Sequence, residues 1–140
     1  MAEITEAELD EIVAASIPWV NDLGLAVEAI GEGTCRARLA YDDRKVRPGG
    51  TVAGPMLIAL ASYAAYVAVL SAAGRVELAA VINQSANFFK GTAGDVIAEA
   101  RIVSRGKRLV TTETRLLAAD PADTLLAQVT ATYSLPAAKS

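Results

Sequence analysis

The feature that most constrains the fold is a long uncharged stretch in the middle of the chain. No charged residue occurs from Pro48 to Gly74, and residues 52–73 are long and apolar enough to cross a bilayer. The stretch is nevertheless rich in alanine and carries polar side chains at Ser62, Tyr63, Tyr66 and Ser71. The flanking segments are amphipathic and need an apolar element to cover. We therefore expect a buried helix rather than a membrane span, with Pro55 in its first turn and Gly74 as its C-terminal cap.

The rest of the chain predicts one short helix and several strands. Thr5 and Glu8 have the spacing of a capping box, and the apolar residues after them recur at helical spacing until Pro18. Strand patterns separated by turns follow at residues 25–30, 34–41, 78–89, 96–105, 109–117 and 124–134. Helices on one face of an antiparallel sheet define an α+β fold. We predict a single domain over residues 1–140, with one sheet around the long helix.

Composition excludes several classes of function. The chain has 140 residues, no histidine and a net charge of −3. Without histidine there is no Ser-His-Asp or Cys-His hydrolase site, and most zinc sites are excluded, so we expect no metal. Without a basic excess, we expect no nucleic-acid partner. Cys35 is the only cysteine; it fits a core position better than a nucleophile, and a reducing cytoplasm as the location.

Three segments together resemble a known family. They are Gly50-Thr51-Val52-Ala53-Gly54-Pro55 running into Leu60-Ala61-Ser62, then Asn83 to Phe89 followed by Gly94-Asp95, and Ser104 to Leu109 with a closing Ala131-Thr132-Tyr133. In order and spacing they are similar to hotdog-fold acyl-CoA thioesterases of the phenylacetate-degradation (PaaI) type. The resemblance implies a hotdog fold, an antiparallel sheet wrapped around one long central helix. It also implies an acyl-CoA ligand, no separate cofactor, and a homodimer or homotetramer with sites at the subunit interface.

The family pattern places the site at the start of the central helix. There a His-Gly pair precedes the helix, a carboxylate follows eight residues after the glycine, and an Asn or Gln lies seven residues before it. The glycine is Gly54 here, whereas Ala53 stands at the histidine position, Ser62 at the carboxylate position and Arg47 at the amide position. The glycine matches the pattern and its polar partners depart from it.

Gly54 has two interpretations. At a helix N-terminus its N–H has no internal partner and carries positive partial charge, so it can polarise a thioester carbonyl. Alternatively, the glycine only permits a tight turn into the helix.

The residues that depart from the family pattern also have two interpretations each. Ser62 cannot act as a base; it can position a water or bond back to a helix carbonyl. Arg47 can bind a carboxylate or phosphate of the ligand, or pair with Asp42 or Asp43. Asp42 or Asp43 can also supply the missing base, although nothing in the sequence requires it.

The remaining candidates lie on the predicted strands and turns. Asn87 and Gln84 fall on opposite faces of one strand, and the resemblance favours Asn87 as the residue that faces the site. We expect the substrate to contact Thr51, Ala53, Pro55, Tyr63 and Phe89, with core packing as the alternative for Tyr63 and Tyr66. Basic side chains around the turn at Gly106 either hold the coenzyme A phosphates or form an ordinary solvated turn: Arg105, Lys107 and Arg108.

Three functions follow from these residues. The first is hydrolysis of a medium-chain or aryl acyl-CoA by Gly54, Ser62 and Asn87. The second is an acyl-CoA-binding protein that has lost catalysis, because Ala53 and Ser62 replace the usual groups. The third is a structural subunit of a hotdog oligomer.

Overall fold

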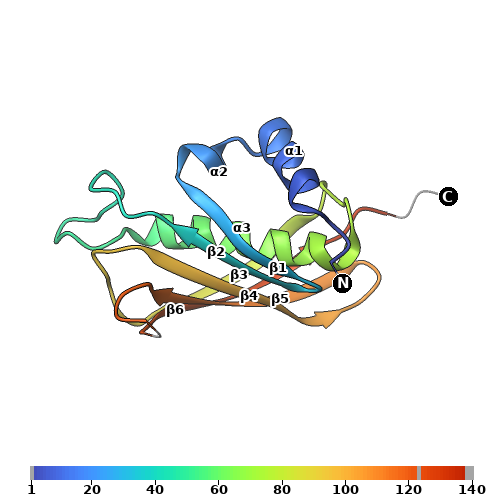
Figure 1. Ribbon diagram of the computed structural model, residues 1–140. Coiled ribbons are helices and arrows are strands. Elements are labelled where there is room, and N and C mark those ends of the chain that lie inside the picture. Colours follow the sequence, from blue (N-terminus) through green and yellow to red (C-terminus); the bar gives the residue numbers. More distant parts are fainter. Residues whose placement is uncertain (1, 123, 138–140) are drawn as a thin grey trace.

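The computed structural model describes residues 2–122 and 124–137 and has α+β architecture. One antiparallel sheet of six strands, in the order β1-β2-β4-β5-β6-β3, curves around the long helix α3 (Figure 1). The elements are α1 (Glu6–Ser16), α2 (Trp19–Asp22), β1 (Leu25–Gly31), β2 (Thr34–Leu39), α3 (Gly54–Ala73), β3 (Ala80–Phe88), β4 (Val96–Arg105), β5 (Leu109–Ala118) and β6 (Leu125–Ser134). The predicted fold class, with its hotdog arrangement, is confirmed.

Helix α3 is the centre of the core. It packs mainly against β2, β4 and β5, and its side chains from Tyr63 to Ala72 are buried, Tyr66 excepted. By length and composition α3 could cross a membrane, but 67% of its most apolar window is buried inside the protein. Its ends follow the sequence prediction, because Pro55 lies in the first turn and Gly74 caps the last with a φ of 84°.

The short N-terminal helix closes the same core. Thr5 and Glu8 form the predicted capping box, and one face of α1 is buried through Leu9, Ile12 and Val13. The sequence from Asn21 to Gly24 predicts a turn, and the structure shows that its first two residues end the four-residue helix α2. The turn predicted at 120–123 includes Asp123, and the tail predicted to fray after Pro136 includes 138–140; these four residues lie outside the described part of the chain.

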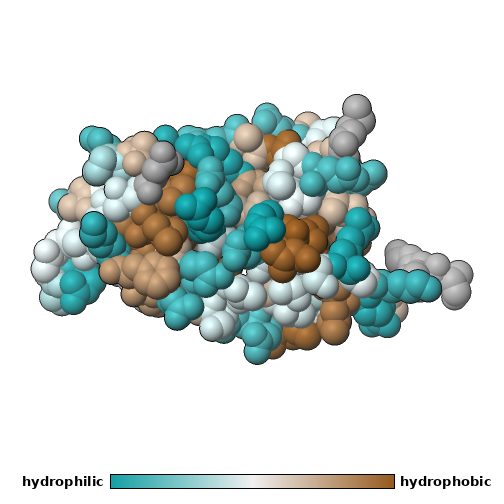
Figure 2. Space-filling view, turned by 90° about the horizontal axis from the view of Figure 1, so that it is seen from below, coloured by the Kyte–Doolittle hydropathy of each residue, from teal (hydrophilic) through white to brown (hydrophobic). Residues whose placement is uncertain are grey.

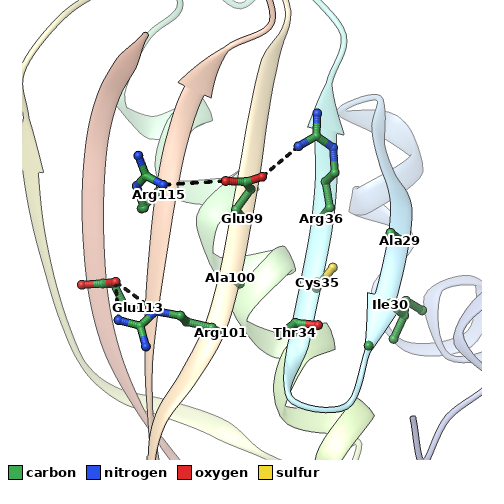
Figure 3. A pocket seen from close by; sticks show the side chains of 11 residues that line it. Ala29, Ile30, Thr34, Cys35, Arg36, Glu99, Ala100, Arg101, Glu113 and Arg115 are labelled. Atoms are coloured by element: carbon green, nitrogen blue, oxygen red, sulfur yellow. Dashed lines mark hydrogen bonds and ion pairs between the residues drawn. The ribbon is translucent and has the colours of Figure 1, made fainter. Parts of the chain in front are cut away.

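The two faces of the sheet differ sharply. Strand residues that face α3 are small or apolar, whereas the outer face carries arginine and glutamate side chains (Figure 3). Arg36 Nη1 donates to Glu99 Oε2 at 2.9 Å, and Arg101 donates to Glu113 Oε1 at 3.0 Å. Figure 2 shows the molecule from below, where hydrophilic side chains surround separate hydrophobic patches.

Candidate functional site

A short, strongly bonded loop sets the start of α3. Val46 and Val52 form an isolated antiparallel bridge, and the N–H of Arg47 donates to the Thr51 carbonyl at 2.8 Å. The turn between them contains two glycines with positive φ, Gly49 at 107° and Gly50 at 90°. This conformation favours glycine. The loop therefore delivers the chain to the first residue of α3 in a defined conformation.

Gly54 is that first residue, and its N–H donates to no atom in the part of the chain that the structure describes. The fold does not require glycine here. Its φ is not in the left-handed region, and an added Cβ would lie 3.9 Å from the Phe88 ring, an ordinary contact. The absence of a side chain leaves the N–H open to a ligand. This geometry favours the ligand-binding interpretation of Gly54 over the tight-turn interpretation.

A cavity of about 380 Å³ opens at this helix end. It brings Gly54 together with three of the predicted contact residues, and its lining is Arg47, Thr51, Val52, Gly54, Leu57, Phe88, Phe89, Lys90 and Gly91. Ala53 and Pro55 flank Gly54 along the chain, half-buried and exposed respectively. Sequence reasoning missed Lys90, whose signal was a cation directly after Phe89.

Arg47 does not pair with the acidic residues of its loop. Asp42 is bonded to Arg44 instead, through a 2.7 Å contact from Nη2 to Oδ2 and a 2.9 Å contact from the backbone N–H. These bonds from Arg44 hold the pKa of the Asp42 carboxyl well below its usual range, so Asp42 is a weak base. Among the described residues Arg47 forms no ion pair, which leaves its guanidinium available for an anion.

Ser62 lies farther along α3 and is bonded to a strand rather than to its own helix. Gln84 Nε2 on β3 donates to Ser62 Oγ at 3.0 Å, and the Tyr133 hydroxyl on β6 donates to the Ser62 carbonyl at 3.1 Å. The alternative in which the Ser62 hydroxyl bonds back to a helix carbonyl is not what the structure shows.

The prediction that Asn87 faces the site was wrong. Asn87 lies opposite Gln128 in the β3–β6 ladder, and its amide contacts the Gln128 side chain at 3.5 Å on the outer face. Gln84 lies opposite Ala131, whose side chain is in the core, so Gln84 points toward α3. Side chains alternate along a strand, and this pairing decides which of the two faces the helix.

A second cavity, of about 410 Å³, lies beside Ser62 and is largely apolar. It is lined by Ser16, Ile17, Trp19, Ser62, Tyr63, Tyr66, Glu77, Leu78, Ala79, Val81 and Tyr133. Tyr63 therefore lines a cavity although only 4% of it is exposed, and the Tyr66 hydroxyl donates to the Glu77 carbonyl at 2.9 Å. Burial raises the pKa of Tyr63 and Tyr133, which keeps both hydroxyls neutral. Trp19, Leu78 and Val81 were not anticipated.

Within one chain the Gly54 cavity and the Ser62 cavity are separate. Eight helical residues separate Gly54 from Ser62, about 12 Å along the axis at 1.5 Å per residue. The basic turn between β4 and β5 is farther still, because β4 runs from the Gly54 end of the sheet to the opposite end. There Arg108 is bonded to Leu135 through backbone and side chain, and Arg105 and Lys107 are exposed. Gly54 and Ser62 of one chain are therefore too far apart to act together on one thioester carbonyl.

A further cavity, of about 540 Å³, lies on the outer face of the sheet and is a poor candidate. Figure 3 shows that its charged side chains point toward one another: Glu99 lies between Arg36 and Arg115, and Arg101 meets Glu113. Its one thiol, Cys35, is buried, and burial raises the pKa of that thiol to about 12. Paired charges and a protonated thiol supply neither an open ligand site nor a nucleophile.

Comparison with known proteins identifies the family of this chain. The model of the thioesterase superfamily matches residues 49–124, more than half of the chain and the part that contains Gly49, α3 and Gln84. The chain belongs to the thioesterase superfamily. No curated protein sequence matches it significantly. The family supports a hydrolase of thioesters as the general activity, and it confirms the resemblance drawn from the sequence.

Several solved structures are similar to this chain over nearly its whole length. A candidate thioesterase from Silicibacter sp. TM1040 is 29% identical with a TM-score of 0.84, over 98% of this chain and 95% of that one. A thioesterase from Haemophilus influenzae is 21% identical with a TM-score of 0.83, over 95% and 91%. The PaaI protein of the Escherichia coli phenylacetic acid degradation operon is 14% identical with a TM-score of 0.82, over 93% and 92%. The last two show the fold alone.

Proposed function

We propose that this protein is an acyl-CoA thioesterase that hydrolyses medium-chain or aryl acyl-CoA. The observation that carries the proposal is the free N–H of Gly54 at the start of α3, open to a cavity with two cationic side chains. A preorganised donor of this kind stabilises the oxyanion of acyl transfer and is worth roughly 2.7–4 kcal/mol in other enzymes. Arg47 and Lys90 beside it suit the phosphates of coenzyme A.

The working unit that we propose is a homodimer joined through β3. This edge strand contains no charged residue, and large apolar side chains on it are exposed, Ile82 by 59% and Phe88 by 53%. An antiparallel pairing of two β3 edges would bring opposite ends of two sheets together. Gly54 of one chain would then approach Ser62 and the basic β4–β5 turn of the partner subunit, which supports sites at the interface. A homotetramer would be two such dimers.

The acyl group would enter the apolar cavity beside Ser62. Its volume of about 410 Å³ and its aromatic lining suit a chain of moderate length or an aryl ring. The predicted roles of Arg105, Lys107 and Arg108 belong to the same proposal, as phosphate contacts across the interface.

The chemistry lacks a strong base. Water adds to the thioester carbonyl carbon, the C–S bond breaks with its electron pair going to sulfur, and the products are the acid and the coenzyme A thiol. Without a general base this step is slower by about 10²–10⁴. The serine at position 62, where the family pattern has a carboxylate, therefore favours a second candidate function. This candidate is a protein that binds acyl-CoA and barely hydrolyses it.

Thiol release tests the proposal. Coenzyme A liberated from a panel of acyl-CoA esters is followed with a disulfide reagent, and binding of the same esters is measured by calorimetry. We expect slow release that is fastest with medium-chain or aryl esters. Release at background across the panel, with binding retained, would identify the binding protein; neither release nor binding would overturn both functions. Ser62→Asp should raise kcat, because it supplies a base.

A further inference from the structure

Gln84 and Ser62 form a neutral polar pair, and Ser62 also lines the apolar cavity. Gln84 comes from the edge strand β3 and Ser62 from α3, so their 3.0 Å bond joins two elements that otherwise make few contacts. One end of the Gln84 amide is used in this bond. The other end has no partner among the described residues and remains available beside a half-buried serine hydroxyl.

A second serine of α3 shows that the arrangement at Ser62 is not the default. Ser71 is fully buried, donates to the Ala68 carbonyl at 2.7 Å and accepts the Gly33 N–H at 2.8 Å. Its O–H donor and one of its acceptor lone pairs serve the fold. Ser62 makes no such bond to its helix, so its hydroxyl has capacity left for a water or a ligand.

We propose that Gln84 is a positioning residue that, together with Ser62, holds the attacking water of thioester hydrolysis. This inference rests on the proposed function. The Gln84 amide oxygen and the Ser62 oxygen accept the two protons of one water, which turns its lone pair toward the carbonyl carbon. When the C–O bond forms and the C–S bond breaks, one water proton goes to the sulfur and the other to solvent.

The surroundings of the pair provide no better base. From α3, Tyr63 and Tyr66 face the cavity, and from β6 Tyr133 does; burial raises the pKa of all three. Glu77 is the one carboxylate among the described lining residues, and its Oε1 accepts from Arg75 Nε at 3.0 Å. A positioned neutral water without a general base attacks at a rate that does not depend on pH, so the pH–rate profile should show no inflection from a titrating carboxylate.

A double-mutant cycle on the full-length protein tests the role. Gln84→Ala, Ser62→Ala and the double variant are compared in kcat, KM and oligomeric state, with Asn83→Ala as the matched control on the outward face of the same strand. We expect kcat to fall about tenfold in each single variant, the size of one neutral hydrogen bond, with KM unchanged. The double variant should fall no further, because both groups hold one water.

The outcomes separate this inference from the function beneath it. An unchanged kcat in Gln84→Ala, in a protein that still releases coenzyme A, overturns the role of Gln84 and leaves the thioesterase standing. A change confined to KM or to dimerisation shows a structural role only and also overturns it. An inflection in the pH–rate profile that disappears in Glu77→Gln would assign the base to Glu77 and overturn the water-positioning pair. If the unmodified protein releases no thiol, the proposed function itself fails.

Discussion

The sheet has two edges, and they are built in opposite ways. At one edge, β1 carries Glu28, which is bonded to Arg36 at 3.1 Å and to Arg38 at 2.6 Å, and α2 packs beside it. At the other edge, β3 has no charge and exposes apolar side chains along its length. Natural sheets protect a free edge with charge, irregularity or a covering element.

The difference teaches where a second chain belongs. Both edge strands contain a register irregularity, between Val27 and Ala29 in β1 and between Val81 and Asn83 in β3. Only β1 adds a paired charge and a covering helix. Because both ligand-sized cavities next to α3 open on the β3 side, the unprotected edge and the candidate site coincide.

The largest effect should come from a charge on the unprotected edge. Ile82→Lys places two like charges at the proposed interface and removes an apolar contact. We expect the dimer dissociation constant to rise about 1000-fold and thioesterase activity to fall to background. Sedimentation velocity over a concentration series measures the first, and thiol release the second.

The matched control is the same substitution on the other edge. Ala29→Lys on β1 should leave both measurements unchanged, since Ala29 is exposed and lines the cavity on the outer face of the sheet. If Ile82→Lys stays dimeric and active, β3 is not the interface and the site cannot be shared as proposed.

A smaller effect is expected from removing a single N–H on the β3 side. Gly54→Pro deletes the donor, and the extended conformation of Ala53 (φ −68°, ψ 144°) is the one that a residue before proline prefers. We expect kcat to fall about 100- to 1000-fold with little change in thermal stability. Gly54→Ala retains the N–H and should lose less; equal losses in the two variants would mean that crowding, and not the donor, matters.

The sequence predicted the strands and the ends of α3 well. Hydrophobic periodicity located the strands to within a few residues, and Pro55 and Gly74 marked the ends of α3 within one residue, because caps and turns are local chemistry. Four of the candidate residues that the resemblance supplied, Gly54, Arg47, Thr51 and Phe89, line one cavity.

The details of the site could not be predicted in the same way. Both faces of β3 carry exposed polar and apolar side chains, so alternation alone cannot tell Gln84 from Asn87; only the register with β6 decides. Lys90 and Trp19 reach their cavities through tertiary packing of segments distant in sequence. The separation of Gly54 from the basic β4–β5 turn likewise depends on strand direction, which periodicity does not contain.

On the β1 side, substitutions should affect stability and leave catalysis intact. Ser71→Ala removes the acceptor of the Gly33 N–H, which ties the β1–β2 turn to α3. A buried donor without a partner costs about 1–3 kcal/mol. We expect that loss in urea unfolding, with kcat unchanged. A parallel loss of kcat would show that the two sides of the molecule are coupled.

The smallest effect should come from the ion pairs that continue inward from the β1 edge. Asp95 accepts the Tyr41 N–H at 2.7 Å and Arg38 Nη1 at 3.0 Å, and these bonds, the Tyr41 one first, lower the pKa of its carboxyl. A lowered pKa stabilises the fold above the unfolded value of about 4 and loses that stabilisation as the pH falls through the folded value. Because the side chain is 37% exposed, we expect Asp95→Asn to cost less than about 1 kcal/mol at pH 7. The difference from the unmodified protein should shrink toward pH 3, measured by urea unfolding at both values. A constant difference would show that the charge of Asp95 contributes nothing, and that this side of the sheet depends on packing alone.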